Sequence, residues 1–215
     1  MFILFATDAP ASIGQVGGKA ASLIRLRQAG FPVPDGFVLT TEFFGPWFDT
    51  VTRSNQWREV TAVMDRIGRG QPDLDTRIAL NVVCDAVKTL AGQLELTADQ
   101  RGALGALETL PGPYAVRSSS PEEDLAGASF AGQYESLLDV HQDGIDDAIR
   151  HCFASCLDAR VLIYKKKMAF DGLAPAIAVV VQVKDVIVHD VVERGLREAA
   201  GAPFMLSGVI LLMEG

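Results

Sequence analysis

Several features that would place a protein outside the cell or in a membrane are scarce in this sequence. Only three cysteines are present, so they cannot all pair within the chain. The later apolar runs, APAIAVVVQV and FMLSGVILLM, are too short to cross a bilayer as helices. The opening residues, MFILFATDAP, have no basic residue ahead of their short apolar stretch, unlike a secretory signal. We therefore expect a cytoplasmic protein.

Positive charge is also in short supply, because 19 lysines and arginines stand against 27 aspartates and glutamates and leave a net charge of −8. Such a balance excludes a generic binder of nucleic acid or of an anionic membrane surface. Any anion that this protein binds must therefore meet a few individually placed cations. With 215 residues, 49% of them hydrophobic, the chain can form one large domain or two small ones around a sizeable core.

Hydrophobic periodicity predicts helices and strands that mix without a regular alternation, so the fold class is α/β or α+β. Strands are expected at residues 2–6, 37–39, 114–117, 134–140 and 175–183, the last of them buried. Helices are expected at residues 18–29, through a helical part at about 55–110, and at 144–170 with a break near Asp158. A capping box is expected where Thr97 precedes Gln100.

A glycine pair and a lysine, Gly17-Gly18-Lys19, stand at the predicted start of the first helix. Glycines let backbone N–H groups approach an anion closely, and a helix N-terminus adds partial positive charge. A lysine placed there can reach phosphate oxygens. The segment lacks the full spacing of a P-loop and the hydroxyl residue after the lysine, so a plain turn with a solvated charge is the alternative.

A second cation, Arg117, is followed directly by three serines at the predicted end of a strand. The planar guanidinium and the neighbouring hydroxyl donors are suited to a phosphate group. The alternative is a structural ion pair with one of the carboxylates at residues 122–124. Local sequence alone does not separate the two.

Two further segments could complete a nucleotide site. The small residues of Gly127–Gln133 around Phe130 are typical of a flap that closes over phosphates and excludes water, although an ordinary hairpin loop is the alternative. The buried strand that ends at Gln182, followed by Lys184, could form one wall of an adenine pocket. A core strand with a polar end is the alternative there.

A zinc site is the weakest of the chemical interpretations. Cys152 and Cys156 are four residues apart beside His151, which could in principle hold a metal ion. No second Cys/His pair stands nearby in the sequence, and helical cysteines at this spacing are usually part of the core. We therefore expect both cysteines to be buried.

Taken together and in this order, GGKAASLIRLRQAGFPVPDGFVLTTEFF, YAVRSSSPEEDLAGASFAGQYESLLDV and AIAVVVQV resemble the nucleotide-binding domain of the phosphoenolpyruvate synthase and pyruvate phosphate dikinase family. Rifampicin phosphotransferases and glucan water dikinases share this domain. The resemblance covers most of residues 11–45 and 111–183. It implies an ATP-grasp-like fold with ATP and Mg²⁺ as ligands. It also implies that a β-phosphate passes to a histidine on a separate domain, with release of AMP and phosphate.

The resemblance also implies roles for individual residues. Lys19 and Arg117 match the family's phosphate-binding lysine and arginine and would act in catalysis. The other nucleotide-binding positions would be Gly17, Gly18 and Ser118 beside the phosphates, Ser129, Gly132 and Gln133 in a glycine-rich lid, and Gln182, Val183 and Lys184 at the adenine hinge. No metal ligand is assigned by the resemblance.

The sequence departs from the family pattern in two places. Ser120-Pro121 stands where the family has Ala-Thr, so any role of that threonine hydroxyl would move to Ser120. Residues 184–215 form an atypical C-terminal segment in which the family's second lobe, with its metal ligands, is not recognisable. Residues 1–183 are therefore expected to form the first lobe of an ATP-grasp-like domain.

Two interpretations of function follow. The chain is either the ATP-binding module of a dikinase-type phosphotransferase or a non-catalytic regulatory or assembly module derived from that domain. A single lobe would leave the apolar face of the strand at residues 175–183 uncovered, so we expect an exposed apolar patch beside it. A second polypeptide or a homodimer would then cover the open cleft.

Overall fold

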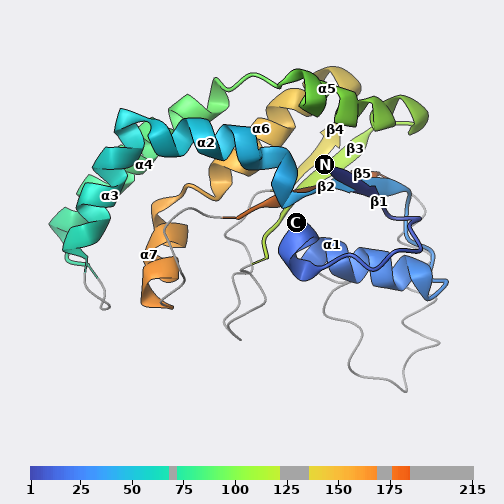
Figure 1. Cartoon of the computed structure of the whole chain (residues 1–215), viewed down its shortest axis with the longest axis horizontal. Coiled ribbons are helices and arrows are strands. Elements are labelled where there is room, and N and C mark those ends of the chain that lie inside the picture. The colour runs from blue at the N-terminus through green and yellow to red at the C-terminus, as the bar shows by residue number, and fades with distance from the viewer. Residues whose placement is uncertain (68–71, 122–135, 169–175, 185–215) are drawn as a thin grey trace.

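A computed structural model describes residues 1–67, 72–121, 136–168 and 176–184. Its centre is a sheet of five strands in the order β1-β2-β5-β3-β4 (Figure 1). The strands are β1 (Phe2–Leu4), β2 (Gly36–Leu39), β3 (Tyr114–Ser119), β4 (Ser136–Val140) and β5 (Ala178–Val183). Every neighbouring pair in this order is antiparallel. The fold class is therefore α+β rather than α/β.

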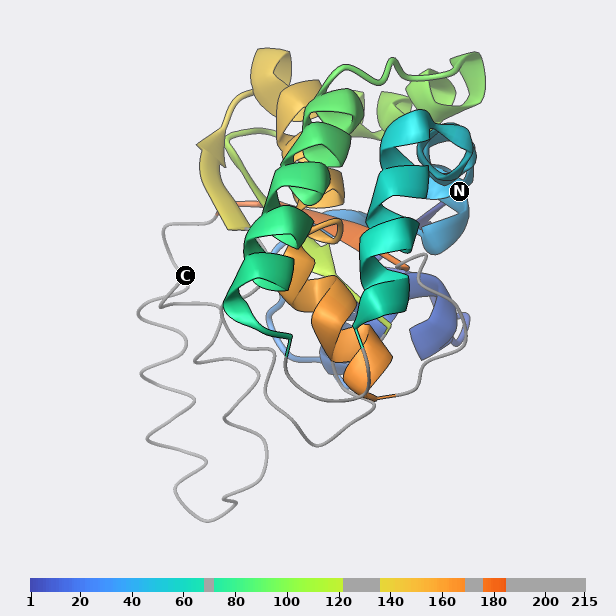
Figure 2. The same cartoon turned by 90° about the vertical axis from the view of Figure 1, so that its left-hand side faces the viewer.

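The helices divide between the two faces of the sheet (Figure 1). One face carries α1 (Ile13–Gln28). The helices on the other side are α2 (Gly45–Arg53), α3 (Asn55–Arg66), α4 (Leu74–Gly92), α5 (Ala98–Leu104), α6 (Ile145–Ser155) and α7 (Ala159–Lys167). Short 3-10 turns accompany them at Thr41–Phe44, Gly105–Thr109 and Gln142–Gly144. Figure 2 shows α3 and α4 lying side by side on the surface of the helical layer.

Local sequence signals set several of the helix ends. The predicted capping box is confirmed, because the Thr97 hydroxyl accepts from the Gln100 amide while the Gln100 side chain accepts from the Thr97 amide. The side-chain NH₂ group of Gln100 also donates to the Phe43 carbonyl, 57 residues earlier, and so connects α5 to the helical layer. The predicted break near Asp158 is confirmed as the gap between α6 and α7, where the Asp158 carboxylate caps α7.

Two hydrophobic cores follow from the strict alternation of side chains along the strands. The larger core lies between the sheet and the helical layer, and its aromatic centre includes a stacked pair, Phe44 and Phe153, with ring centroids 5.6 Å apart. The smaller core lies under α1, where Val16 and Ile24 pack with Val38 and Val180. The core to which a strand residue belongs therefore shows which face of the sheet its side chain is on.

The central position of β5 corrects one expectation. Residues 177–181 are at most 1% exposed, because odd-numbered residues face the larger core and even-numbered ones face the smaller core. The predicted exposed apolar patch beside this strand is therefore wrong. Exposed apolar side chains stand instead four residues apart on α4, at Leu74, Ile78 and Val82.

The strand that carries the second cation is longer than predicted. β3 does not end at Arg117, because Arg117, Ser118 and Ser119 continue the antiparallel ladder opposite Val180, Val179 and Ala178 of β5. Arg117 therefore projects from a fixed position within the sheet rather than from a turn.

Candidate functional site

The first candidate segment, Gly17-Gly18-Lys19, lies at a kink in α1. The backbone of Gly17 has φ 74° and ψ 170°, while the rest of Ile13–Gln28 is helical. This combination of angles is essentially restricted to glycine, because a Cβ atom would clash with the backbone. The helix begins at Ile13, five residues before the predicted start at Gly18, and Lys19 is half-buried just after the kink.

Gly17 also lies in close contact with β3. A Cβ atom added to Gly17 would lie 2.3 Å from the carbonyl oxygen of Ser119 and 2.4 Å from its hydroxyl oxygen. Such distances leave no room for any side chain at residue 17. The glycine therefore allows two segments that are about 100 residues apart in the sequence to touch.

The hydroxyl of Ser119 joins the two segments by hydrogen bonds. It accepts from the backbone amide of Ala20 at 3.1 Å and donates to the backbone carbonyl of Val16 at 2.7 Å. Both contacts are buried. The kinked segment of α1 is thus held against the strand that carries Arg117.

The strand register places Arg117 on the same face of the sheet as α1. Residues directly opposite each other in an antiparallel pair share a face, and Arg117 is opposite Val180, which packs in the core under α1. Ser119 is on this face as well. Ser118 lies on the opposite face and is only 1% exposed, so the structure does not bring it together with Lys19.

Arg117 occupies a partly desolvated position. Burial lowers the pKa of its guanidinium below the usual value, because removal from water disfavours the charged form. The group still carries its charge at neutral pH, since arginine is not deprotonated in proteins. A partly buried cation on the α1 face of the sheet favours the binding of an anion there.

The predicted adenine hinge lies on the neighbouring strand. Gln182 shares the α1 face, two residues beyond Val180 on β5, and its side-chain amide donates to the Pro34 carbonyl at 3.4 Å. The amide of Val183 donates to the carbonyl of Asp35, and the amide of Lys184 to that of Pro113. These two amides therefore already donate within the chain.

Lys184 is engaged through its side chain as well. Its ammonium group forms an ion pair with Asp139 of β4, the strand on the far side of β3 from β5. Asp139 itself has a positive φ of 58°. The charge of Lys184 is therefore balanced by a neighbouring carboxylate.

The three predicted lid positions, Ser129, Gly132 and Gln133, lie outside the described residues, as does the whole flap at residues 127–133. The carboxylates at residues 122–124, named as the alternative partners of Arg117, also lie outside them. Both expectations stay predictions.

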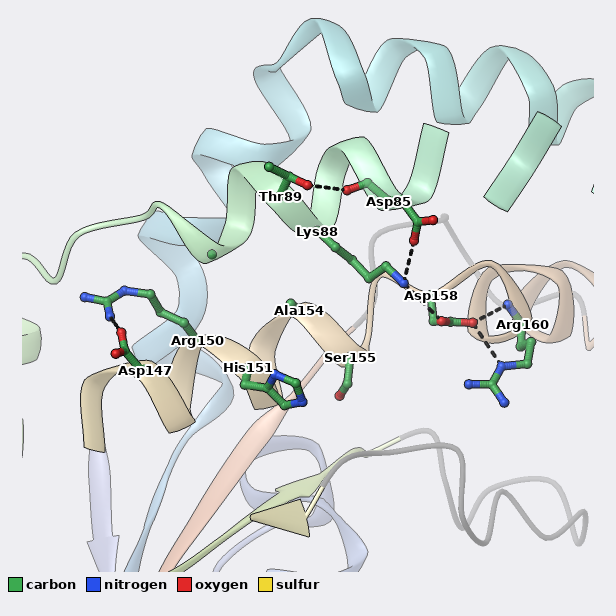
Figure 3. Close-up of a pocket in the computed structure, with 11 residues that line it drawn as sticks. Asp85, Lys88, Thr89, Asp147, Arg150, His151, Ala154, Ser155, Asp158 and Arg160 are labelled. Carbon is green, nitrogen blue, oxygen red and sulfur yellow. Dashed lines mark hydrogen bonds and ion pairs between the residues drawn. The ribbon is translucent and has the colours of Figure 1, made fainter. Parts of the chain in front are cut away.

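A separate groove of about 580 Å³ lies in the helical layer, between α4 and the α6–α7 segment (Figure 3). Its cations are Lys88, Arg150 and Arg160, and its carboxylates are Asp85, Asp147 and Asp158. Each of these cations forms an ion pair with one or more of the carboxylates. The three positive and three negative charges of these side chains therefore cancel. Neither Lys19 nor Arg117 lines it.

The cysteines beside this groove belong to the core. Cys152 and Cys156 are fully buried, as expected, and each thiol contacts a backbone carbonyl, of Val116 and Phe153 respectively. Within the part of the chain that the structure describes, no group of three or more His, Cys, Asp or Glu side chains could hold a metal ion. The burial of both thiols agrees with the expectation that these cysteines belong to the core.

The fold defines the class of protein as an α+β domain in which α1 covers one face of an antiparallel sheet and the helical layer covers the other. None of the described helices combines the length and the apolar character that a bilayer crossing demands. The family model for the AMP/ATP-binding domain of pyruvate phosphate dikinase matches residues 13–209. This chain belongs to that family.

Curated relatives agree with this assignment. A probable phosphoenolpyruvate synthase of Methanothermobacter thermautotrophicus is 32% identical over 176 residues, which cover 79% of this chain and 25% of the relative. The phosphoenolpyruvate synthase of Pyrococcus furiosus is 33% identical over 202 residues, with 78% and 24% covered. The rifampicin phosphotransferase of Bacillus cereus is 32% identical over 176 residues, with 78% and 19% covered. The chain thus spans a quarter or less of the length of these relatives.

Sequence reasoning missed Ser119 as a member of the site. The signal was available, because residues two apart in a strand share a face, so position 119 rather than 118 accompanies Arg117. Its contact with α1 could not be read in this way, since it depends on where the helix lies.

Proposed function

We propose that this chain binds ATP as its magnesium complex, with the phosphate groups between Lys19 and Arg117. The ammonium and guanidinium groups would neutralise phosphate charge, and the amides at the kinked start of α1 would donate to phosphate oxygens. The adenine ring would lie towards Gln182 on the same face of the sheet. Family membership supports a nucleotide as the ligand.

One observation carries this proposal. Gly17 and Ser119 touch, so the segments that contain Lys19 and Arg117 are neighbours on one face of the sheet. Two cations from distant parts of the sequence, one of them partly desolvated, fit a polyanion better than a neutral ligand. The groove in the helical layer is a separate place in the fold, since neither of these two cations lines it.

Magnesium fits this site only as a companion of the nucleotide. The described residues contain no group of side chains that could hold a metal ion by themselves. We therefore assign no protein ligand to Mg²⁺, and the roles of Lys19 and Arg117 do not depend on one. Both act by charge and hydrogen bonding on the phosphates.

We extend the proposal to the whole enzyme by analogy with the family. The described sheet and helices would form the first lobe of an ATP-grasp-like domain, with residues 184–215 as a separate segment. In that setting a phosphoryl group of ATP would pass to a histidine on another domain, and Lys19 and Arg117 would neutralise charge that develops during the transfer. A second polypeptide or a second copy of the chain would complete the cleft.

A non-catalytic regulatory or assembly module is the second candidate. It is favoured by the sequence of residues 184–215, in which the family's second lobe with its metal ligands is not recognisable. Such a module would still bind the nucleotide through the same two cations. Binding therefore tests the site, while formation of AMP separates the two candidates.

Calorimetric titration of Mg-ATP into the chain tests the proposed site. Replacement of a charged donor that contacts phosphate removes about 1.5–3 kcal/mol, or roughly 10- to 150-fold in affinity. We expect a loss of this size for Lys19→Ala and for Arg117→Ala. The matched control is Arg25→Ala, which removes an exposed cation from the same helix and should leave the affinity within about twofold.

Two results of this titration would contradict the proposal. Absence of ATP binding by the parent protein would reject a nucleotide site in this chain. Binding by Lys19→Ala and Arg117→Ala as tight as that of Arg25→Ala would place the nucleotide elsewhere.

A further inference from the structure

We infer that Ser119 is a positioning residue, which fixes the phosphate-binding start of α1 in the conformation that ATP requires. The inference rests on the proposed function, because it concerns the same site. It adds a residue that was not among the predicted ones and that acts through Lys19 and Gly17 rather than on the nucleotide itself.

The two hydrogen bonds of Ser119 replace one bond of the helix. In a regular α-helix the amide of Ala20 would donate to the carbonyl of Val16, four residues earlier. Here the Ser119 hydroxyl stands between them, accepting from Ala20 at 3.1 Å and donating to Val16 at 2.7 Å. A side chain inserted into the helical ladder is a recognised cause of a kink. The kink at Gly17 therefore has a definite origin in β3.

The Ser119 hydroxyl forms hydrogen bonds on both sides of the candidate segment Gly17-Gly18-Lys19. Val16 and Ala20 flank Gly17-Gly18-Lys19 on both sides, so both ends of the segment are held by one side chain. The backbone angles of Gly17, φ 74° and ψ 170°, which essentially only glycine adopts, lie between these anchors. Without the hydroxyl, the Ala20 amide and the Val16 carbonyl could re-form the helical bond. Gly17 would then lose its special conformation.

The same residue also sets the distance to Arg117. Ser119 follows Arg117 by two positions in β3, so their side chains leave the same face about 6.6 Å apart along the strand. The Ser119 hydroxyl is hydrogen-bonded to α1 directly. The separation between the kinked segment of α1 and the position of Arg117 in β3 is therefore set by the sheet. A polyphosphate that contacts both cations needs this separation to be constant.

The test compares ATP affinity in Ser119→Ala and Ser155→Ala. Ser155 is the matched control, because it is a buried serine whose hydroxyl donates to a backbone carbonyl at 2.7 Å, in α6 on the other side of the sheet. We expect Ser119→Ala to bind Mg-ATP at least about tenfold more weakly. Ser155→Ala should stay within about threefold of the parent. Equal affinity of the two variants, with the parent binding normally, would overturn the inference.

A double-mutant cycle separates positioning from a general loss of structure. If Ser119 acts partly through Lys19, Ser119→Ala should have a clearly smaller effect in a Lys19→Ala background than in the parent, because one of the groups it positions is already gone. Additive losses would show that the hydroxyl does not act through Lys19 and would overturn the inference. Should Ser119→Ala fail to fold, Ser119→Cys and Ser155→Cys replace the pair, with the same expected difference and the same contradicting result.

The two proposals fail in different ways. A parent protein that does not bind ATP rejects the proposed function. A parent that binds ATP and responds to Lys19→Ala but not to Ser119→Ala rejects only the role of Ser119.

Discussion

At the scale of single residues, Gly17 shows why this site needs particular amino acids. It combines a positive φ with a close approach to Ser119, so both its backbone angles and the space around it exclude a side chain. Gly14, three residues earlier in the same helix, has nothing within 4 Å of an added Cβ atom. The two glycines therefore have opposite expected responses to substitution.

Gly17→Ala is expected to destabilise the protein. The forced backbone conformation alone costs about 1–3 kcal/mol, and the contact with Ser119 adds to this. Gly14→Ala should be neutral or stabilise by up to about 1 kcal/mol, because alanine is the better helix former. Urea unfolding of both variants measures the difference. A Gly17→Ala protein as stable as Gly14→Ala would show that the kink is not strained.

At the scale of elements, Asp158 links α4 to α7. Its carboxylate accepts from the Arg160 amide at 3.0 Å at the start of α7 and pairs with Lys88 of α4 at 3.4 Å (Figure 3). Partial burial opposes ionisation of Asp158, but the hydrogen bonds from Arg160 and the charge of Lys88 outweigh it and lower its pKa below 3.8. The ionised carboxylate therefore stabilises the helical layer.

The sign of this pKa shift fixes a pH dependence. The pKa is lower in the folded than in the unfolded protein, so the stabilisation is complete above pH 3.8 and is lost as the pH falls below that value. In urea unfolding between pH 6 and about 3, Asp158→Asn should lose less stability than the parent, because it keeps a capping oxygen without a charge. The exposed Asp65→Asn is the control. Parallel losses in all three proteins would contradict the assignment.

At the scale of the whole molecule, the two faces of the sheet have different roles. The larger core and the helical layer stabilise the domain, while the α1 face holds the residues of the proposed site. Because β5 is covered on both sides, the reason first given for a second polypeptide no longer holds. A partner that completes the cleft stays a proposal.

The chain by itself is expected to bind Mg-ATP without converting it. Phosphoryl transfer needs a metal ion held against the phosphates and an acceptor group in line, and the family's second lobe, with its metal ligands, is not recognisable in residues 184–215. Incubation with radiolabelled ATP and magnesium should therefore give neither AMP nor a labelled protein above background. Clear turnover would contradict this expectation and would point to ligands among the residues that the structure does not describe.

Much of the fold was predictable because it depends on local chemistry. Helical periodicity located α3, α4 and α5, the hydroxyl and amide of the capping box fixed the start of α5, and Asp158 marked the break before α7. The apolar run of β5 predicted a buried strand. The end of β3 was misjudged, because polar residues at 117–119 resemble a turn until the ladder with β5 is known.

The sequence by itself determined the chemical character of the site: a glycine pair, one lysine and one arginine in an acidic chain. Only the tertiary structure decided how they meet. The register of β3 against β5 turns Arg117 and Ser119 towards α1 and Ser118 away, and the position of α1 lets the Ser119 hydroxyl enter the helix at Gly17. The physical reason is that side-chain direction and contact between distant segments depend on strand pairing and helix packing, which no local pattern specifies.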